Sequence, residues 1–176
     1  MTELPHWQKA LVCQRRPKTG CVTTGFEYLI RYANICNPSF IQDNNVDLEH
    51  FQDQFDFDYN KKNNEPMENN FTRIADAVKS ELNIDIEHKK FDSGHDKVKC
   101  LEQFMGQGVP CIMSFQYQWG KHIVPVIAVD DKCVKVILYV QEDQQPKIIC
   151  HSRESIEKQH DKLNAQDLCN EIAWLK

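Results

Sequence analysis

Residues 20–35 read GCVTTGFEYLIRYANI and carry the strongest helical pattern in the chain. The apolar residues of this stretch recur at intervals of three and four, as on one face of a helix: Phe26, Leu29, Ile30 and Ala33. Pro38 ends the pattern because proline disfavours helix at the residue before it. The sequence therefore predicts a helix over residues 21–35 that begins with Cys21.

The second half of the chain has a different period. Short segments rich in Val and Ile predict strands at residues 110–116, 122–129, 134–140 and 147–150. Residues 130–132 form a hairpin-sized connection between the second and third of these strands. Further elements are expected at 70–82 (helix), 84–91 (short strand), 95–105 (helix) and from Asn164 onward, where a last helix would turn Leu168, Ile172 and Leu175 inward. Helices followed by an antiparallel sheet indicate an α+β fold.

The length of 176 residues fits a single domain, residues 1–176, with one core. Residues 42–70 stand apart, because Asn, Asp, Gln and Glu crowd this stretch and only a few aromatic side chains interrupt it. We expect a polar loop insertion with a helical turn near residues 48–55. Such an insertion either covers a cleft or is a solvated excursion pinned by its aromatics.

Composition and charge exclude several classes of protein. The formal net charge of −5 disfavours a nucleic-acid-binding protein, which needs a clustered excess of Lys and Arg. No apolar run approaches the roughly 18 residues that span a bilayer, so no membrane insertion is expected. The chain opens without a secretory signal, which favours a cytoplasmic location.

Eight cysteines are present, and no two of them are separated by two residues. This spacing provides neither a zinc ribbon nor a thioredoxin-type pair, and we expect no metal and no cofactor. Cys111, Cys133 and Cys150 lie in apolar stretches, where a reduced thiol acts as a small hydrophobic residue. We expect these thiols to be reduced and structural.

Three residues stand in an order that suggests nucleophilic catalysis. Cys21 opens the predicted helix, where the peptide dipoles favour the thiolate. His122 begins a predicted strand about a hundred residues later, and an imidazole beside the thiol would accept its proton. Gln14 precedes Cys21 by seven residues, so its side-chain amide and the Cys21 backbone N–H could donate to an oxyanion.

These residues resemble a known family. Residues 14–30, with Gly20-Cys21-Val22-Thr23-Thr24-Gly25, are similar to the catalytic helix of papain-like cysteine peptidases. Within that family, the similarity is to the branch of double-glycine leader (bacteriocin-processing) peptidases and their stand-alone relatives. Residues 106–114 and the hairpin that begins at His122 resemble the second half of the same branch. The resemblance spans roughly residues 12–140, leaves 42–70 unmatched, and implies a papain-like α+β fold with a peptide or protein substrate.

In this family a third residue, Asp or Asn, orients the histidine from the end of the second hairpin strand. Residues 134–139 are apolar or basic apart from Tyr139, so Asp143 just beyond them is the first candidate for this role. The other six histidines lack ligand spacing and are expected at the surface. Two functions stay open: a cysteine peptidase or related acyl hydrolase or transferase, and an inactive papain-like module that binds a peptide or protein. The oligomeric state is not determined by the sequence.

Overall fold

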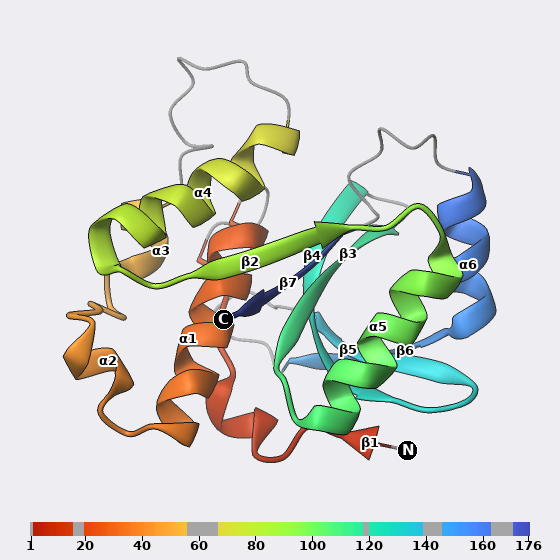
Figure 1. The fold of residues 1–176 in the computed structure, drawn as a ribbon, viewed down its shortest axis with the longest axis horizontal. Coiled ribbons are helices and arrows are strands. Elements are labelled where there is room, and N and C mark those ends of the chain that lie inside the picture. Colours follow the sequence, from red (N-terminus) through yellow and green to blue (C-terminus); the bar gives the residue numbers. More distant parts are fainter. Residues whose placement is uncertain (1, 16–19, 56–66, 118–119, 139–145, 163–170) are drawn as a thin grey trace.

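The computed structural model describes residues 2–15, 20–55, 67–117, 120–138, 146–162 and 171–176 (Figure 1). Its helices are η1 (Trp7–Ala10), α1 (Cys21–Cys36), α2 (Phe40–Asp43), α3 (Phe51–Phe55), α4 (Met67–Leu82), α5 (Gly94–Gln107) and α6 (Arg153–Lys162). Its strands are β1 (Thr2–Glu3), β2 (Ile86–Lys90), β3 (Cys111–Tyr117), β4 (Gly120–Val129), β5 (Cys133–Leu138), β6 (Lys147–Ser152) and β7 (Glu171–Leu175). The expected α+β class is confirmed.

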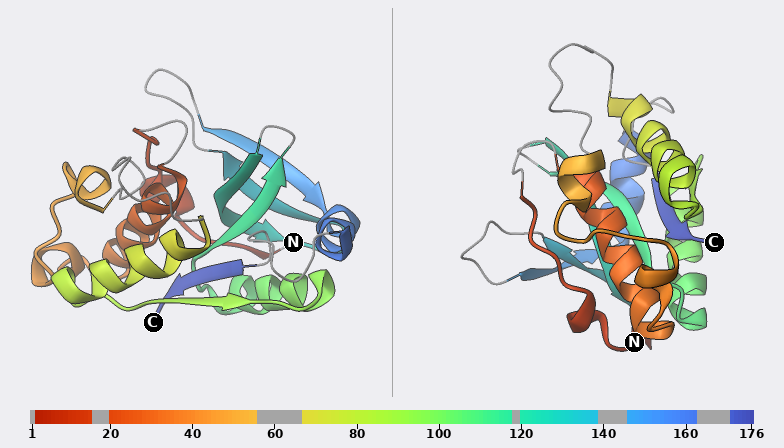
Figure 2. Two further views of the ribbon diagram at one scale, coloured as in Figure 1. Left: turned by 90° about the horizontal axis from the view of Figure 1, so that it is seen from above. Right: turned by 90° about the vertical axis from the view of Figure 1, so that its left-hand side faces the viewer.

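The described strands form one antiparallel sheet in the order β2–β7–β3–β4–β5–β6, and β1 pairs with the end of β4. Helices lie on both sides of this sheet (Figures 1 and 2). Ile112 of β3 lies against Gly25 of α1. Trp174, which is paired with the neighbouring Cys111, instead contacts Phe104 of α5, with ring centroids 5.0 Å apart. Because successive side chains of a strand alternate, α1 and α5 cover opposite faces of the sheet.

Several elements agree with the sequence-based expectations. Helix α1 occupies Cys21–Cys36, and β2 (Ile86–Lys90) is the short strand expected within residues 84–91. Helix α5 ends at Gln107, and the next residue, Gly108, adopts the left-handed conformation (φ 70°) typical of a residue just past a helix. The expected hairpin joins β4 to β5, and the Asp130 carboxylate accepts the backbone N–H groups of Lys132 and Cys133 at 2.8 Å each.

The prediction of a last helix from Asn164 is wrong for residues 171–175, the part of this segment that the structure describes. Residues Glu171–Leu175 form β7, a strand inserted between β2 and β3, and α6 lies earlier in the chain. Ile172 and Ala173 are fully buried. Pairing with two strands more than fifty residues away outweighs the helical spacing of the apolar side chains, and a local pattern carries no signal of that pairing.

The polar stretch 42–70 contributes a buried element to the fold. The helical turn expected near residues 48–55 is present as α3, and its Phe51 and Phe55 side chains are completely buried, with ring centroids 4.9 Å apart. Residues 56–66 lie outside the described part of the chain. Within the described part of the insertion, α3 therefore belongs to the core.

The expectation that Cys133 and Cys150 are reduced thiols is wrong, because the structure joins them in a disulfide between β5 and β6. Their strands bring the two α-carbons to 5.9 Å, a separation that a disulfide spans. Cys111 is free and completely buried, as expected, and burial raises the pKa of its thiol. The cytoplasmic prediction, which relied partly on reduced thiols, loses that support.

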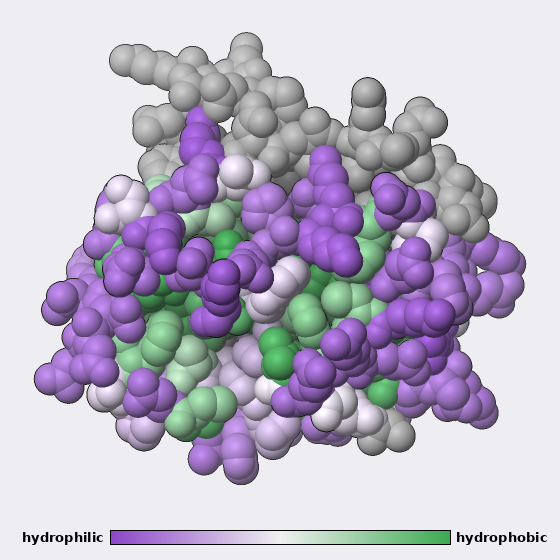
Figure 3. All heavy atoms as spheres, viewed as in Figure 1, coloured by the Kyte–Doolittle hydropathy of each residue, from purple (hydrophilic) through white to green (hydrophobic). Residues whose placement is uncertain are grey.

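The surface in Figure 3 is covered mostly by hydrophilic residues, with smaller apolar areas between them. No helix in the described part of the chain combines the length and apolar character needed to cross a membrane.

Candidate active site

Cys21 is the first residue of α1, directly after the N-cap Gly20, and only 5% of it is exposed. The hydroxyls of Thr23 and Thr24 lie 3.1 and 2.5 Å from the Gly20 carbonyl oxygen and fix the turn into the helix. Gly20 offers no capping side chain, and the first turn of α1 contains no acidic residue. The positive end of the helix dipole therefore acts on Cys21 without a neighbouring carboxylate in that turn, which favours the thiolate.

His122 lies near the start of β4, opposite Phe115 of β3, and is 6% exposed. Burial disfavours the charged imidazolium and lowers the pKa of His122 to about 4. The imidazole is therefore neutral at pH 7 and is able to accept a proton.

Helix α1 and strand β4 run side by side in the same direction. At one end, a β-carbon built on Gly25 would lie 2.8 Å from Ile112 Cδ1 and 3.3 Å from Ile123 Cγ2. At the other end, the Tyr32 hydroxyl donates to the Pro5 carbonyl at 2.7 Å. The preceding residue of that segment, Leu4, pairs with Ile127 near the end of β4.

This alignment brings the starts of α1 and β4 to the same end of the fold. Cys21 precedes Gly25 by one helical turn, about 6 Å along the helix axis. His122 precedes Ile123 by one strand residue, about 3.3 Å. Measured along α1 and β4 from the contact between Gly25 and Ile123, Cys21 and His122 thus lie toward the same end of the fold.

The side chain of His122 shares a sheet face with Phe115 and Tyr117, while Ile123 takes the face toward α1. The rings of Tyr117 and His122 have centroids 6.1 Å apart in an edge-to-face arrangement. The Tyr117 hydroxyl lies 2.9 Å from His151 Nε2, and the His151 ring stacks on Phe115 at 4.1 Å.

The sequence-based interpretation missed Tyr117 and placed His151 at the surface. In the structure His151 is half-buried, and burial lowers its pKa. In the strand order β4 and β5 separate β6 from β3, so the contact of His151 with Phe115 and Tyr117 depends on the curvature of the sheet, which no local sequence motif reveals.

Gln14 is buried, with 5% of it exposed, and the backbone groups on either side of it are held by Gln52 of α3. Gln52 was also missed, since it lies in the unmatched stretch 42–70. Asp143 lies outside the described residues, so its role stays a prediction. No three His, Cys, Asp or Glu side chains converge as a metal site within the part that the structure describes.

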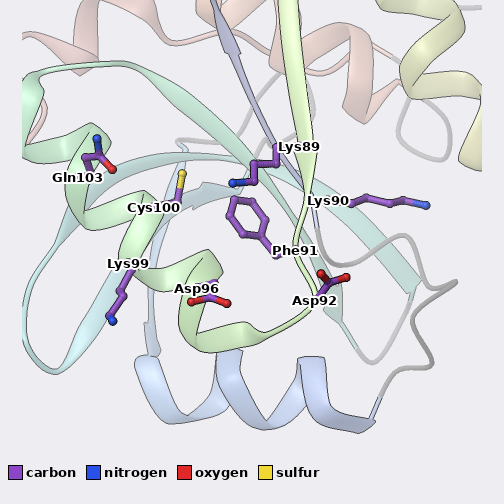
Figure 4. Close-up of a pocket in the computed structure, with 8 residues that line it drawn as sticks. All are labelled: Lys89, Lys90, Phe91, Asp92, Asp96, Lys99, Cys100 and Gln103. Atoms are coloured by element: carbon purple, nitrogen blue, oxygen red, sulfur yellow. The ribbon is translucent and has the colours of Figure 1, made fainter.

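A cavity of about 360 Å³ lies elsewhere, between the end of β2 and α5 (Figure 4). The Lys89 side chain lies over the ring of Phe91, with Nζ 5.0 Å from the ring centroid, and fills part of this cavity. The side chains of Lys90 and Lys99 point away from each other rather than into a common centre. The cavity belongs to the α5 side of the sheet and contains neither Cys21 nor His122.

Comparison with protein-family models and with curated proteins finds nothing that matches this chain. The chemistry of the site is therefore argued from its own residues: a thiol at a helix start, a buried neutral imidazole at the same end of the fold, and a buried glutamine amide.

Proposed function

We propose that this protein is a papain-like cysteine hydrolase of acyl bonds, with Cys21 as nucleophile and His122 as general base. The contact between α1 and β4 at Gly25 and Ile123 carries the proposal. It brings the starts of α1 and β4, whose residues Cys21 and His122 have complementary chemistry, to the same end of the fold, although the His122 side chain takes the sheet face opposite to that of Ile123. The substrate class is a peptide or protein.

In this proposal His122 accepts the proton of Cys21 as the sulfur attacks a carbonyl carbon. The Gln14 side-chain amide and the Cys21 backbone N–H donate hydrogen bonds to the oxyanion that forms. Protonated His122 then gives its proton to the leaving amine, and a water molecule hydrolyses the thioester. Attack by an amine or a thiol instead of water would make the same site an acyltransferase.

The lowered pKa of His122 determines its protonation state before the reaction. A buried imidazole is a weak base, so His122 is a neutral imidazole in the resting state. Proton transfer then accompanies the attack. A third group that orients the ring would assist, and Asp143→Asn should lower turnover about tenfold, or about 1.4 kcal/mol, if Asp143 is that group.

The test is hydrolysis of a mixture of synthetic peptides and peptidyl thioesters, followed by mass spectrometry. The wild-type chain should cleave members of the mixture, and Cys21→Ala should not. Cys36→Ala is the matched control, because Cys36 is an exposed thiol at the opposite end of the same helix. Equal cleavage by Cys21→Ala and the wild type would contradict the proposal.

A binding module is the second candidate. The ring contacts described for His122 are with an aromatic residue, Tyr117, and this favours a packed rather than a catalytic imidazole. Peptide binding without turnover, unchanged in Cys21→Ala, would support this candidate.

A further inference from the structure

Gln52 of α3 is 4% exposed, yet its amide has four polar contacts. Its Nε2 donates to the Cys13 carbonyl at 2.9 Å and to Glu27 Oε2 at 2.8 Å. Its Oε1 accepts from the Arg15 backbone N–H at 3.0 Å and lies 3.1 Å from Thr24 Oγ1. The single hydrogen of the Thr24 hydroxyl is shared between Gln52 Oε1 and the Gly20 carbonyl oxygen, so Gln52 uses both of its donor hydrogens and at least one of its two acceptor positions.

Two of these bonds flank Gln14. The carbonyl of the preceding residue and the N–H of the following residue are both bound by one side chain, much as a neighbouring strand would bind them. This pairing restrains the backbone dihedral angles of Gln14, and the direction of its buried side chain follows from them.

The other two contacts reach the first turns of α1. Thr24 is three residues after Cys21, and its hydroxyl also lies 2.5 Å from the N-cap carbonyl oxygen of Gly20. Glu27 is held from its other side by Arg31, whose Nε donates at 2.8 Å. One amide therefore connects the segment around Gln14 with the helix start that carries Cys21.

We propose that Gln52 is a positioning residue that fixes Gln14 relative to Cys21 as an oxyanion donor; this inference rests on the proposed function. The polar insertion would then serve the site through α3. The completely buried Phe51 and Phe55 hold that short helix in the core.

The substitution Gln52→Met keeps the volume of the side chain and removes all four contacts. Gln54→Met is the matched control, since Gln54 is on the same helix but binds Glu81 at an exposed site. Hydrogen exchange of the Arg15 amide reports the restraint directly. We expect faster exchange in Gln52→Met and unchanged exchange in Gln54→Met, and equal protection in both would overturn the inference.

Two reagents separate positioning from a general structural role. Acylation of Cys21 by p-nitrophenyl acetate passes through an oxyanion, whereas alkylation by iodoacetamide does not. We expect Gln52→Met to slow acylation by about tenfold or more, because small displacements of a donor cost rate steeply, and to change alkylation by less than about twofold.

Gln14→Ala should give the same pattern, and the double variant should lose no more than Gln14→Ala alone, since both changes remove one interaction. Equal losses in both reactions, or losses that multiply in the double variant, would overturn the inference and leave the proposed function intact. An unacylated Cys21 in the wild type would instead overturn the proposed function, and the positioning role with it.

Discussion

Gly25 of α1 lies against Ile123 of β4, one helical turn after Cys21 and one residue after His122. The absence of a side chain at Gly25 allows this close approach, because a β-carbon there would lie 2.8 Å from Ile112 Cδ1. The distance between helix and sheet at the candidate site is therefore set by one glycine.

Gly25→Val should separate α1 from β4 and lower the free energy of unfolding by about 2 kcal/mol, as overpacked cores do. Gly106→Val is the matched control, because a β-carbon on that helical glycine meets no atom within 4 Å. Urea unfolding measures both. Equal stability of the two variants would show that the contact at Gly25 is not tight.

Cys21 should react with iodoacetamide at neutral pH faster than the exposed thiols Cys13 and Cys36, despite its burial. The helix start stabilises the negative charge that develops on its sulfur, and neutral His122 accepts the proton as the sulfur attacks, whereas burial raises the pKa of Cys100 and Cys111. Peptide mapping after limited alkylation gives the order. Labelling of Cys21 more slowly than Cys13 and Cys36 would count against a catalytic thiol.

The stability of the protein should depend on pH through His122. Burial lowers its pKa from 6.5 to about 4, so between these values the unfolded chain binds a proton that the folded chain does not. The free energy of unfolding therefore rises with pH across this window, and about 3 kcal/mol is lost as the pH falls through it.

Urea unfolding at pH 4.5 and pH 7.5 tests this dependence. The difference between the two values should shrink in His122→Gln and stay unchanged in His95→Gln, whose imidazole is 59% exposed. A pH dependence that is the same in all three proteins would exclude His122 as its source.

The disulfide between Cys133 and Cys150 should stabilise the β5–β6 pair. It closes a segment with a sequence separation of 17, for which the expected stabilisation is about 3 kcal/mol. Removing both thiols by Cys133→Ser with Cys150→Ser should lower stability to that of the reduced wild type. Cys36→Ser serves as control, and a reductant without effect on the wild type would show that the bond is absent in solution.

Local sequence patterns correctly predicted the elements that depend on interactions between residues close together in the sequence. Helix α1 has a continuous apolar face, α5 has a glycine stop at Gly108, and the β4–β5 hairpin has a short polar turn at Asp130. The same patterns failed for β7, whose partners are β2 and β3, and for Gln52, whose bonds reach residues 25 to 39 positions away.

The candidate site divides in the same way. The order of Gln14, Cys21 and His122 could be recognised from the sequence. Cys21 opens a predicted helix, His122 begins a predicted strand, and Gln14 lies seven residues before Cys21. The Tyr117–His151 contact and the Gln52 amide could not, since they depend on the curvature of the sheet and on the placement of α3.

The decisive measurement is acylation of Cys21 by p-nitrophenyl acetate, followed by intact-mass analysis and peptide mapping. We predict one acetyl group on Cys21 in the wild type, none at the other thiols over the same time, and acylation of Cys21 about a hundredfold slower in His122→Gln, as expected for loss of a general base. Acylation of Cys21 at the same rate in the wild type and in His122→Gln would contradict the proposal that these two residues form a catalytic pair.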